Sequence, residues 1–203
     1  MIAVVDYGMG NLGSITKALE YVGGKVKLTS KPEDLAHADQ IVLPGVGAFG
    51  DGMKELDVRG FLPVLKEEIQ KKKKPLLGVC LGMQLLAHTS TEFGEHKGLG
   101  WLKSSVVRLS SIPKLKIPHV GWNGVVFLKD HPMLAGIESG SDFYFVHSYH
   151  MLCDDRDLII GTVDYGESIT AIVAFDNIFA TQFHPEKSQK VGLKILKNFL
   201  SWK

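Results

Sequence analysis

The chain has little cysteine, no long hydrophobic run and almost no net charge. Two cysteines are too few for a disulfide framework, and no His or Cys cluster has the spacing of a zinc site, so we expect no metal and no cofactor. The formal net charge is +1, with acids and bases interspersed, which argues against charge-driven binding to nucleic acid or to a membrane surface. No apolar run is long enough to cross a bilayer.

The amino terminus also lacks the features of a signal peptide. It has no basic region, and an acid follows already at Asp6. The 203 residues have an ordinary globular composition, without repeats, low-complexity segments or linkers. We therefore expect a cytoplasmic protein that forms one domain over residues 1–203.

In the first half of the chain, short apolar runs alternate with amphipathic stretches. Such alternation predicts a parallel sheet with helical crossovers on both faces. The predicted strands are 2–6, 26–29, 40–43 and 75–80, and the predicted helices are 14–22, 32–38, 51–74 with interruptions near Gly60 and Pro63, and 81–89.

After about Gly94 the pattern changes to closely spaced strands, and a terminal amphipathic helix is predicted over 190–202. These strands suggest antiparallel pairing that flanks or extends the parallel sheet. The predicted class is α/β, a mostly parallel central sheet flanked by helices with additional antiparallel strands. Those strands are predicted at 106–109, 124–128, 142–152, 159–164, 169–175 and 178–182.

The stretch around Cys80 is the first candidate for chemistry. Gly78 and Gly82 surround the cysteine in a G-x-C-x-G pattern between an apolar run and a predicted helix, the thiol counterpart of a nucleophile elbow. Glycines are expected there because a Cβ would clash with neighbouring backbone. The turn would place the sulfur at a helix N-terminus, where the dipole favours a thiolate. Cys153 has no such surroundings and is interpreted as structural.

A thiol nucleophile needs a base, and the base needs a group that orients it. Among eight histidines, His184 is distinct, because it follows an apolar strand and precedes the last helix. In extended backbone the side chains of His184 and Glu186 would point to the same side. Glu186 would then bind one ring nitrogen and leave the other for Cys80.

An oxyanion hole would complete the site. The Leu81 N–H follows the nucleophile, and Val46 or Gly47 in a glycine-rich turn after the third strand can supply a second donor. Glycines there also permit a peptide to reorient.

Gly8, Gly10 and Gly13 fit the G-x-G-x-x-G pattern of dinucleotide-binding proteins. The acid expected near the end of the second strand is absent, since that strand runs into Ser30 and Lys31. A tight strand-to-helix turn explains the same glycines. An NAD(P)-dependent oxidoreductase stays as a minor alternative.

Together, the elbow and the Phe-His-Pro-Glu segment at 183–186 resemble class I (triad) glutamine amidotransferases, which have a flavodoxin-like fold. The resemblance covers nearly the whole chain. The segments Pro-Gly-Val-Gly at 44–47, Pro-His-Val-Gly-Trp-Asn at 118–123, Tyr-Phe-Val-His-Ser-Tyr at 144–149 and His-Pro-Glu-Lys-Ser at 184–188 narrow it to the glutaminase subunits of imidazole glycerol phosphate synthases.

The resemblance implies a Cys80, His184 and Glu186 triad that hydrolyses glutamine to glutamate and ammonia. It also implies a partner, a (β/α)₈ cyclase that uses the ammonia in histidine biosynthesis, within a heterodimer. By the same resemblance, the glutamine pocket comprises Gly47, Gln84, Glu92, Ser148 and Tyr149, and the partner interface comprises Asn11, Trp122, Asn123, Tyr144 and Lys187.

Two further alternatives stay open on the sequence alone. Similar subunits occur in surface-polysaccharide loci, where the ammonia amidates a sugar. A non-catalytic interaction subunit is disfavoured because all three triad residue types are present.

Overall fold

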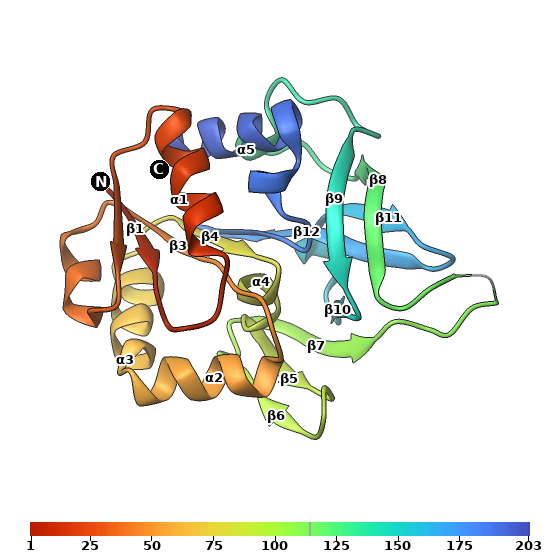
Figure 1. Ribbon diagram of the computed structural model, residues 1–203, viewed down its shortest axis with the longest axis horizontal. Coiled ribbons are helices and arrows are strands. Elements are labelled where there is room, and N and C mark those ends of the chain that lie inside the picture. The colour runs from red at the N-terminus through yellow and green to blue at the C-terminus, as the bar shows by residue number, and fades with distance from the viewer. Residues whose placement is uncertain (114) are drawn as a thin grey trace.

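The structure, a computed structural model, describes residues 1–113 and 115–203 and is organised around two β-sheets (Figure 1). The larger sheet has nine strands in the order β2-β1-β3-β4-β13-β12-β11-β8-β9. Its strands are β1 (Ile2–Val5), β2 (Val26–Thr29), β3 (Gln40–Leu43), β4 (Leu76–Val79), β8 (His119–Phe127), β9 (Asp142–His147), β11 (Ile159–Asp164), β12 (Ser168–Phe175) and β13 (Ile178–Thr181). The smaller sheet has four strands in the order β10-β7-β5-β6, namely β5 (Ala87–Ser90), β6 (His96–Lys97), β7 (Leu102–Arg108) and β10 (Tyr149–Cys153).

Helices cover both faces of the larger sheet (Figure 1). On one face α1 and α5 pack against each other, and on the other face lie α2 and α3. The α-helices are α1 (Leu12–Tyr21), α2 (Phe49–Val58), α3 (Phe61–Leu65), α4 (Leu81–Gln84) and α5 (Gln189–Ser201); Lys66–Lys71 continues α3 as a π-helix, and Pro32–His37, Pro132–Leu134, Arg156–Leu158 and Pro185–Lys187 are 3₁₀-helices.

The buried strands serve two hydrophobic cores, one on each face of the sheet. Along β3, Val42 packs with helices α1 and α5, whereas Ile41 and Leu43 belong to the cluster under α2 and α3. This alternation is the period of two that a strand imposes on its side chains. A strand buried on both faces is mostly apolar, which is why β1 and β4, and β3 after Gln40, read as continuous hydrophobic runs.

The predicted α/β class is confirmed. Strands β1, β2, β3, β4 and β13 are parallel, and β12, β11, β8 and β9 extend the sheet in antiparallel fashion. Because β3, β4 and β13 are parallel neighbours, their carboxyl ends meet at one edge of the sheet. The turns that follow these three strands carry the candidate site.

The predicted helix over 81–89 is wrong beyond its first turn. The helix α4 ends at Gln84, and strand β5 begins at Ala87. The backbone carbonyls of Leu85, Leu86 and Ala87 accept hydrogen bonds from the N–H groups of residues 99–102. These tertiary bonds occupy the carbonyls that a continuing helix would use.

The predicted single strand over 142–152 is also wrong. It is two strands, β9 in the larger sheet and β10 in the smaller one, separated at Ser148. The Ser148 carbonyl accepts from the Leu109 N–H at 2.9 Å, and the His147 ring bonds the Tyr149 carbonyl at 2.9 Å. These bonds hold the chain where it changes sheets.

The predicted helical stretch 51–74 is interrupted at Gly60 but not at Pro63. Gly60 has φ +74°, in the left-handed region that favours glycine. Pro63 lies in the first turn of α3, where a missing N–H costs no helical hydrogen bond. Other elements also begin earlier than predicted, among them α1 at Leu12, α2 at Phe49, β7 at Leu102 and β8 at His119.

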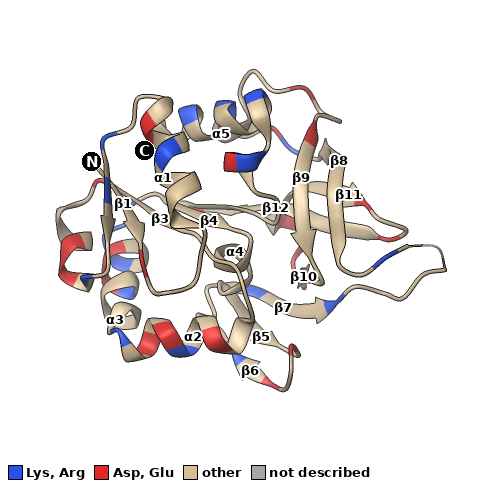
Figure 2. Ribbon diagram, viewed as in Figure 1, with Lys and Arg blue, Asp and Glu red and all other residues tan. Residues whose placement is uncertain are grey.

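Charged residues of both signs are spread over the surface (Figure 2). Helix α2 carries charges of both signs, whereas α5 carries lysines and no acid. Within residues 1–113 and 115–203 there is no helix of the length and apolarity needed to span a membrane.

The close packing of Gly82 generates the first prediction. A Cβ on Gly82 would lie 1.8 Å from the Leu43 carbonyl oxygen, so Gly82→Ala should lower the free energy of unfolding by about 3 kcal/mol. As a control, Gly13 in α1 has nothing within 4 Å of an added Cβ, and Gly13→Ala should stabilise by about 0.5 kcal/mol. Urea unfolding of both variants measures the contrast. An unaltered midpoint for Gly82→Ala would contradict the close contact.

Candidate active site

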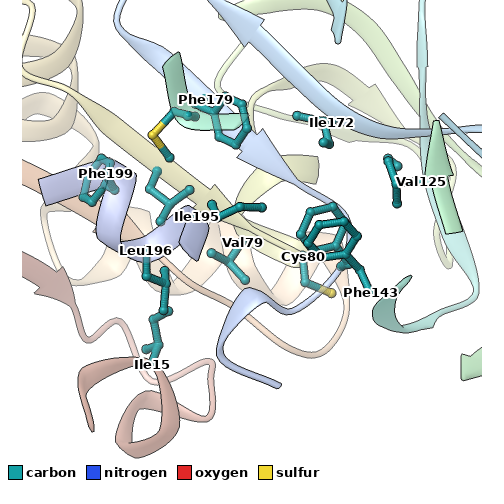
Figure 3. Close-up of a cluster of buried hydrophobic side chains, with 14 of the residues drawn as sticks. Ile15, Val79, Cys80, Val125, Phe143, Ile172, Phe179, Ile195, Leu196 and Phe199 are labelled. Atoms are coloured by element: carbon teal, nitrogen blue, oxygen red, sulfur yellow. The ribbon is translucent and has the colours of Figure 1, made fainter. Parts of the chain in front are cut away.

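Cys80 lies directly after β4 in a backbone conformation that few non-glycine residues adopt. Its φ is +54° and its ψ is −108°, a strained geometry that the surrounding structure must hold in place. The Cys80 N–H donates to the Thr181 carbonyl at 2.7 Å, and the Cys80 carbonyl accepts from the Met83 and Gln84 N–H groups. The side chain lies at the end of the strand beside Phe143, within the core cluster under α5 (Figure 3).

The glycines of the elbow have the packing role that the sequence predicts. A Cβ on Gly78 would lie 3.0 Å from the Ala180 Cβ and 3.1 Å from the Gly82 carbonyl oxygen. The helix dipole predicted to favour a thiolate at Cys80, in contrast, stabilises it little, because α4 spans only 4 residues. Stabilisation of a thiolate must therefore come from nearby side chains and N–H groups.

His184 and Glu186 form a buried pair. The His184 Nδ1 atom lies 2.8 Å from the Glu186 Oε1 atom, and both side chains are 3% exposed. The backbone between them is a 3₁₀ turn, Pro185–Lys187, and not the extended chain that the spacing argument assumed. Ser188 fixes this turn, since its hydroxyl donates to the His184 carbonyl at 2.6 Å and accepts from the Tyr144 N–H at 3.0 Å.

The charges around His184 favour its ionised form. Burial alone lowers the pKa of His184, but the Cys80 thiolate and the Glu186 carboxylate outweigh burial and raise this pKa to about 9. The Nε2 atom of the ring is buried and has no hydrogen-bond partner among the described residues. A buried ring nitrogen without a partner, close to Cys80, can take the proton of the thiol.

A cavity of about 420 Å³ opens beside Cys80. It brings together the turns after β3 and β4 with the segment that joins the two sheets at Ser148. Its lining contains all the residues predicted for the substrate pocket: Gly47, Gln84, Glu92, Ser148 and Tyr149, together with Val46, Cys80, Leu81, Pro118, Val146, His147 and Lys187.

Glu92 is anchored at the edge of this cavity. Its Oε2 atom accepts from the Phe49 N–H at 2.7 Å, at the N-terminus of α2. Partial burial raises the pKa of the Glu92 carboxyl. The Glu92 Oε2 atom is thus held at the N-terminus of α2.

The three predicted oxyanion donors lie at the cavity, but they do not form a hole. The Leu81 N–H donates to the Gly45 carbonyl at 3.3 Å, so the site of an oxyanion is filled by this carbonyl. Gly47 has φ +111°, a conformation accessible to glycine and unfavourable for other residues. Rotation of the peptide between Gly45 and Val46 would turn the carbonyl away and present the Val46 N–H.

Three of the residues predicted for the partner interface contact one another on a partly exposed surface. The rings of Trp122 and Tyr144 pack edge to face with centroids 5.8 Å apart, and the Lys187 Nζ atom lies 5.8 Å above the Tyr144 ring. Trp122 is 44% exposed and so is not a core aromatic. Asn123 bonds the Asp164 carbonyl at 3.3 Å, and Asn11 is exposed at the start of α1.

Sequence reasoning missed Gln182 and His147. Gln182 lies two residues before His184, and its Nε2 atom is 3.7 Å from the Cys80 sulfur. The period-two argument applied to Glu186 would also have found Gln182. His147 lines the cavity from the segment where the chain changes sheets, and its local sequence carried no signal of that position.

Within the part of the chain that the structure describes, no group of three or more His, Cys, Asp or Glu side chains is arranged to hold a metal ion. The turn at Gly8, Gly10 and Gly13 joins β1 to α1. Gly8 has φ +85°, and its N–H donates to the Asp6 carboxylate at 3.1 Å. The demands of a tight turn account for Gly8, whereas Gly13 lies within α1, where nothing lies within 4 Å of an added Cβ.

The family model described as class I glutamine amidotransferase matches residues 3–202. A full-length relative from Aquifex aeolicus (strain VF5), an imidazole glycerol phosphate synthase subunit HisH, is 50% identical over 197 residues, covering 97% of this chain and 94% of the relative. The HisH 1 subunit of Campylobacter jejuni (strain RM1221) is 48% identical over 200 residues, covering 98% and 99%.

The chain belongs to the class I glutamine amidotransferase family.

Solved structures agree with this family in fold. A structure described as a glutamine amidotransferase superposes with a TM-score of 0.77 at 18% identity, covering 100% of this chain and 98% of that one. The structure of PurLQS from Thermotoga maritima gives a TM-score of 0.74 at 20% identity, covering 99% and 97%.

Titration of His184 can test the charges that this account gives to the buried pair of His184 and Glu186. In Glu186→Gln the imidazolium loses its ion-pair partner, so the pKa of His184 should fall below about 9. In Cys80→Ala the thiolate is lost, and this pKa should fall as well. NMR titration of the His184 ring measures both shifts. An equal titration midpoint in the wild type and in both variants would contradict the account.

The same pKa sets a pH dependence of stability. Because the pKa of His184 in the folded chain, about 9, lies above its ordinary value of 6.5, the ionised ring stabilises the fold fully below about pH 6.5. This contribution is lost as the pH rises through 9. The free energy of unfolding lost in Glu186→Gln should therefore be largest near pH 6 and shrink above pH 9.

Proposed function

We propose that the chain is the glutaminase subunit of an imidazole glycerol phosphate synthase. The observation that carries the proposal is the cavity that Cys80 shares with Gln84 and Glu92, on a chain whose full-length relatives bear that subunit's name. Residues 1–203 would form one glutaminase domain, which the family match over 3–202 supports. We assign it to the cytoplasm because those relatives are named for a biosynthetic enzyme.

In the proposed reaction, Cys80 is the nucleophile and His184 carries the proton. The thiolate attacks the side-chain amide carbon of glutamine, and the C=O electron pair moves onto oxygen. His184 donates its proton to the amide nitrogen, the C–N bond breaks, and ammonia leaves a γ-glutamyl thioester. His184 then takes a proton from water, the hydroxide adds to the thioester, and glutamate leaves as the thiolate re-forms. Glu186 holds the ring in position and stabilises its charge.

The hydrogen bond between Leu81 and Gly45 suggests that the isolated subunit is in a resting state. Gly45 presents a carbonyl where the developing oxyanion needs a donor, and this carbonyl would repel negative charge. Partner binding would rotate the Gly45 peptide, present the Val46 N–H and free the Leu81 N–H. The two donors would then face the oxyanion.

The ammonia would pass to a (β/α)₈ cyclase in a heterodimer. Free ammonia in water is mostly protonated, and ammonium is no nucleophile, so an enclosed transfer is needed. The cavity supports this direction of transfer, because Pro118, Val146 and Lys187 line it from the side of β8 and β9. Lys187 also contacts Tyr144 on the surface assigned to the partner.

The proposed function can be tested by measuring the hydrolysis of glutamine and the use of ammonia by the acceptor as two separate activities. Alone, the wild-type chain should hydrolyse glutamine slowly, and the rate should rise at least tenfold when a histidine-pathway cyclase and its ribotide substrate are added. In the complex, Cys80→Ala should abolish product formation from glutamine but leave product formation from ammonium salt intact.

Glutamine-driven turnover by Cys80→Ala would refute the proposal. If the wild type is not stimulated by the histidine-pathway cyclase but remains a glutaminase, the acceptor is another one, as in the surface-polysaccharide alternative. Cys153→Ala is the matched control and should leave both activities unchanged, because Cys153 lies on β10 outside the cavity lining.

A substitution of Trp122, on the exposed aromatic surface, tests the proposed interface. Trp122→Ala removes a large half-exposed ring and should raise the dissociation constant for the cyclase by about 30-fold. Glutaminase activity should recover when the cyclase is present at a saturating concentration. Phe175→Ala, which removes a ring of similar exposure at the opposite edge of the sheet, should leave binding unchanged. Surface plasmon resonance measures both, and equal effects of the two variants would exclude this interface.

A further inference from the structure

Gln182 is a fully buried polar residue between the end of β13 and His184. Its backbone N–H donates to the Ala171 carbonyl at 2.9 Å, which holds this segment beside β12. Its carboxamide lies between two groups of the site, with one end 3.7 Å from the Cys80 sulfur and the other end 3.0 Å from the Gln84 carboxamide. The reaction as described so far assigns Gln182 no role.

The direction of these hydrogen bonds follows from one backbone carbonyl. The Tyr149 carbonyl can only accept, so the Gln84 atom that lies 2.9 Å from it must be the NH₂ group. The same NH₂ group faces Gln182, and the atom of Gln182 that receives it must therefore be the oxygen. The NH₂ group of Gln182 is then the end that faces the Cys80 sulfur.

Two buried histidines support the same direction. The His147 Nδ1 atom also lies 2.9 Å from the Tyr149 carbonyl and must donate to it. Its Nε2 atom then accepts from the His119 Nδ1 atom at 3.0 Å. Burial lowers the pKa of His147 to about 3, so the ring is neutral and keeps this tautomer at neutral pH. Both lone pairs of the Tyr149 carbonyl are thus occupied by donors.

We propose that Gln182 is a positioning residue of the amidotransferase reaction, whose carboxamide donates a hydrogen bond to the Cys80 thiolate and whose orientation is set through Gln84 by the Tyr149 carbonyl. This hydrogen bond stabilises the Cys80 thiolate, which the short helix α4 does little to stabilise. It also fixes what Gln84 presents to the substrate. Both Gln84 hydrogens are used, so Gln84 offers its oxygen to glutamine. The inference rests on the proposed function only in taking Cys80 as the nucleophile.

Alkylation of the full chain by iodoacetamide tests the donor without requiring glutamine or a partner. Gln182→Met keeps the volume and removes the donor, so Cys80 alkylation at pH 7 should slow about tenfold. Gln182→Glu keeps the acceptor for Gln84 and turns a carboxylate oxygen toward the sulfur, so it should slow Cys80 alkylation at least as much. Peptide mapping by mass spectrometry follows each cysteine separately.

Two controls separate this role from a structural one. Cys153 reports loosening of the fold, and its alkylation should stay slow in every variant, because burial raises its pKa to about 11. Gln40→Met removes a buried carboxamide that bonds the Phe199 and Trp202 carbonyls at the far end of β3, and it should leave Cys80 alkylation unchanged.

The outcomes distinguish the inference from the proposed function. Wild-type alkylation at Cys80 no faster than at Cys153 would overturn the nucleophile assignment itself. Fast wild-type alkylation that neither Gln182 variant slows, or that Gln40→Met slows equally, would overturn the role of Gln182 alone. An unchanged rate in Gln182→Glu with a slowed rate in Gln182→Met would also overturn the role of Gln182 as a donor, because a carboxylate cannot donate a hydrogen bond to the sulfur.

Discussion

The contact between Gly82 and the Leu43 carbonyl is the constraint on which the site depends. It holds the turn after β4 against the end of β3, and within this turn Cys80 has a positive φ. The strain at Cys80 is offset by backbone hydrogen bonds to Thr181, Met83 and Gln84. A larger residue in place of Gly82 would separate Cys80, the proposed nucleophile, from the loop that we propose to stabilise the transition state.

The parallel sheet then brings the residues of the site together. Strands β3, β4 and β13 end at one edge, so the glycine-rich loop after β3, a thiol and an imidazole from distant parts of the sequence meet without a long connection. Burial makes their charges effective, because His184 and Glu186 interact where water does not screen them. The segment that joins the antiparallel extension to the smaller sheet adds Ser148 and Tyr149, and the extension itself carries the aromatic surface assigned to the partner.

Local patterns were sufficient where one short segment determines the geometry. The elbow glycines, the apolar strands and the spacing of His184 and Glu186 could be read from the sequence, although the last pair meets through a 3₁₀ turn. The length of α4 and the change of sheet at Ser148 could not be predicted, since both depend on hydrogen bonds from residues far along the chain. The link from Gln182 to Cys80 likewise requires two strands to be adjacent. The orientation of the Gly45 peptide could not be predicted from the sequence either, because glycine permits either peptide orientation.

Trapping the acyl-enzyme tests most directly the claim that Cys80 carries the glutamyl group. The chain, with its cyclase partner present, is mixed with isotopically labelled glutamine, quenched in acid during turnover and mapped by mass spectrometry. The account predicts a γ-glutamyl adduct on the peptide that contains Cys80, absent from Cys80→Ala and from samples without glutamine. Turnover without any adduct at Cys80, or an adduct confined to Cys153, would contradict it.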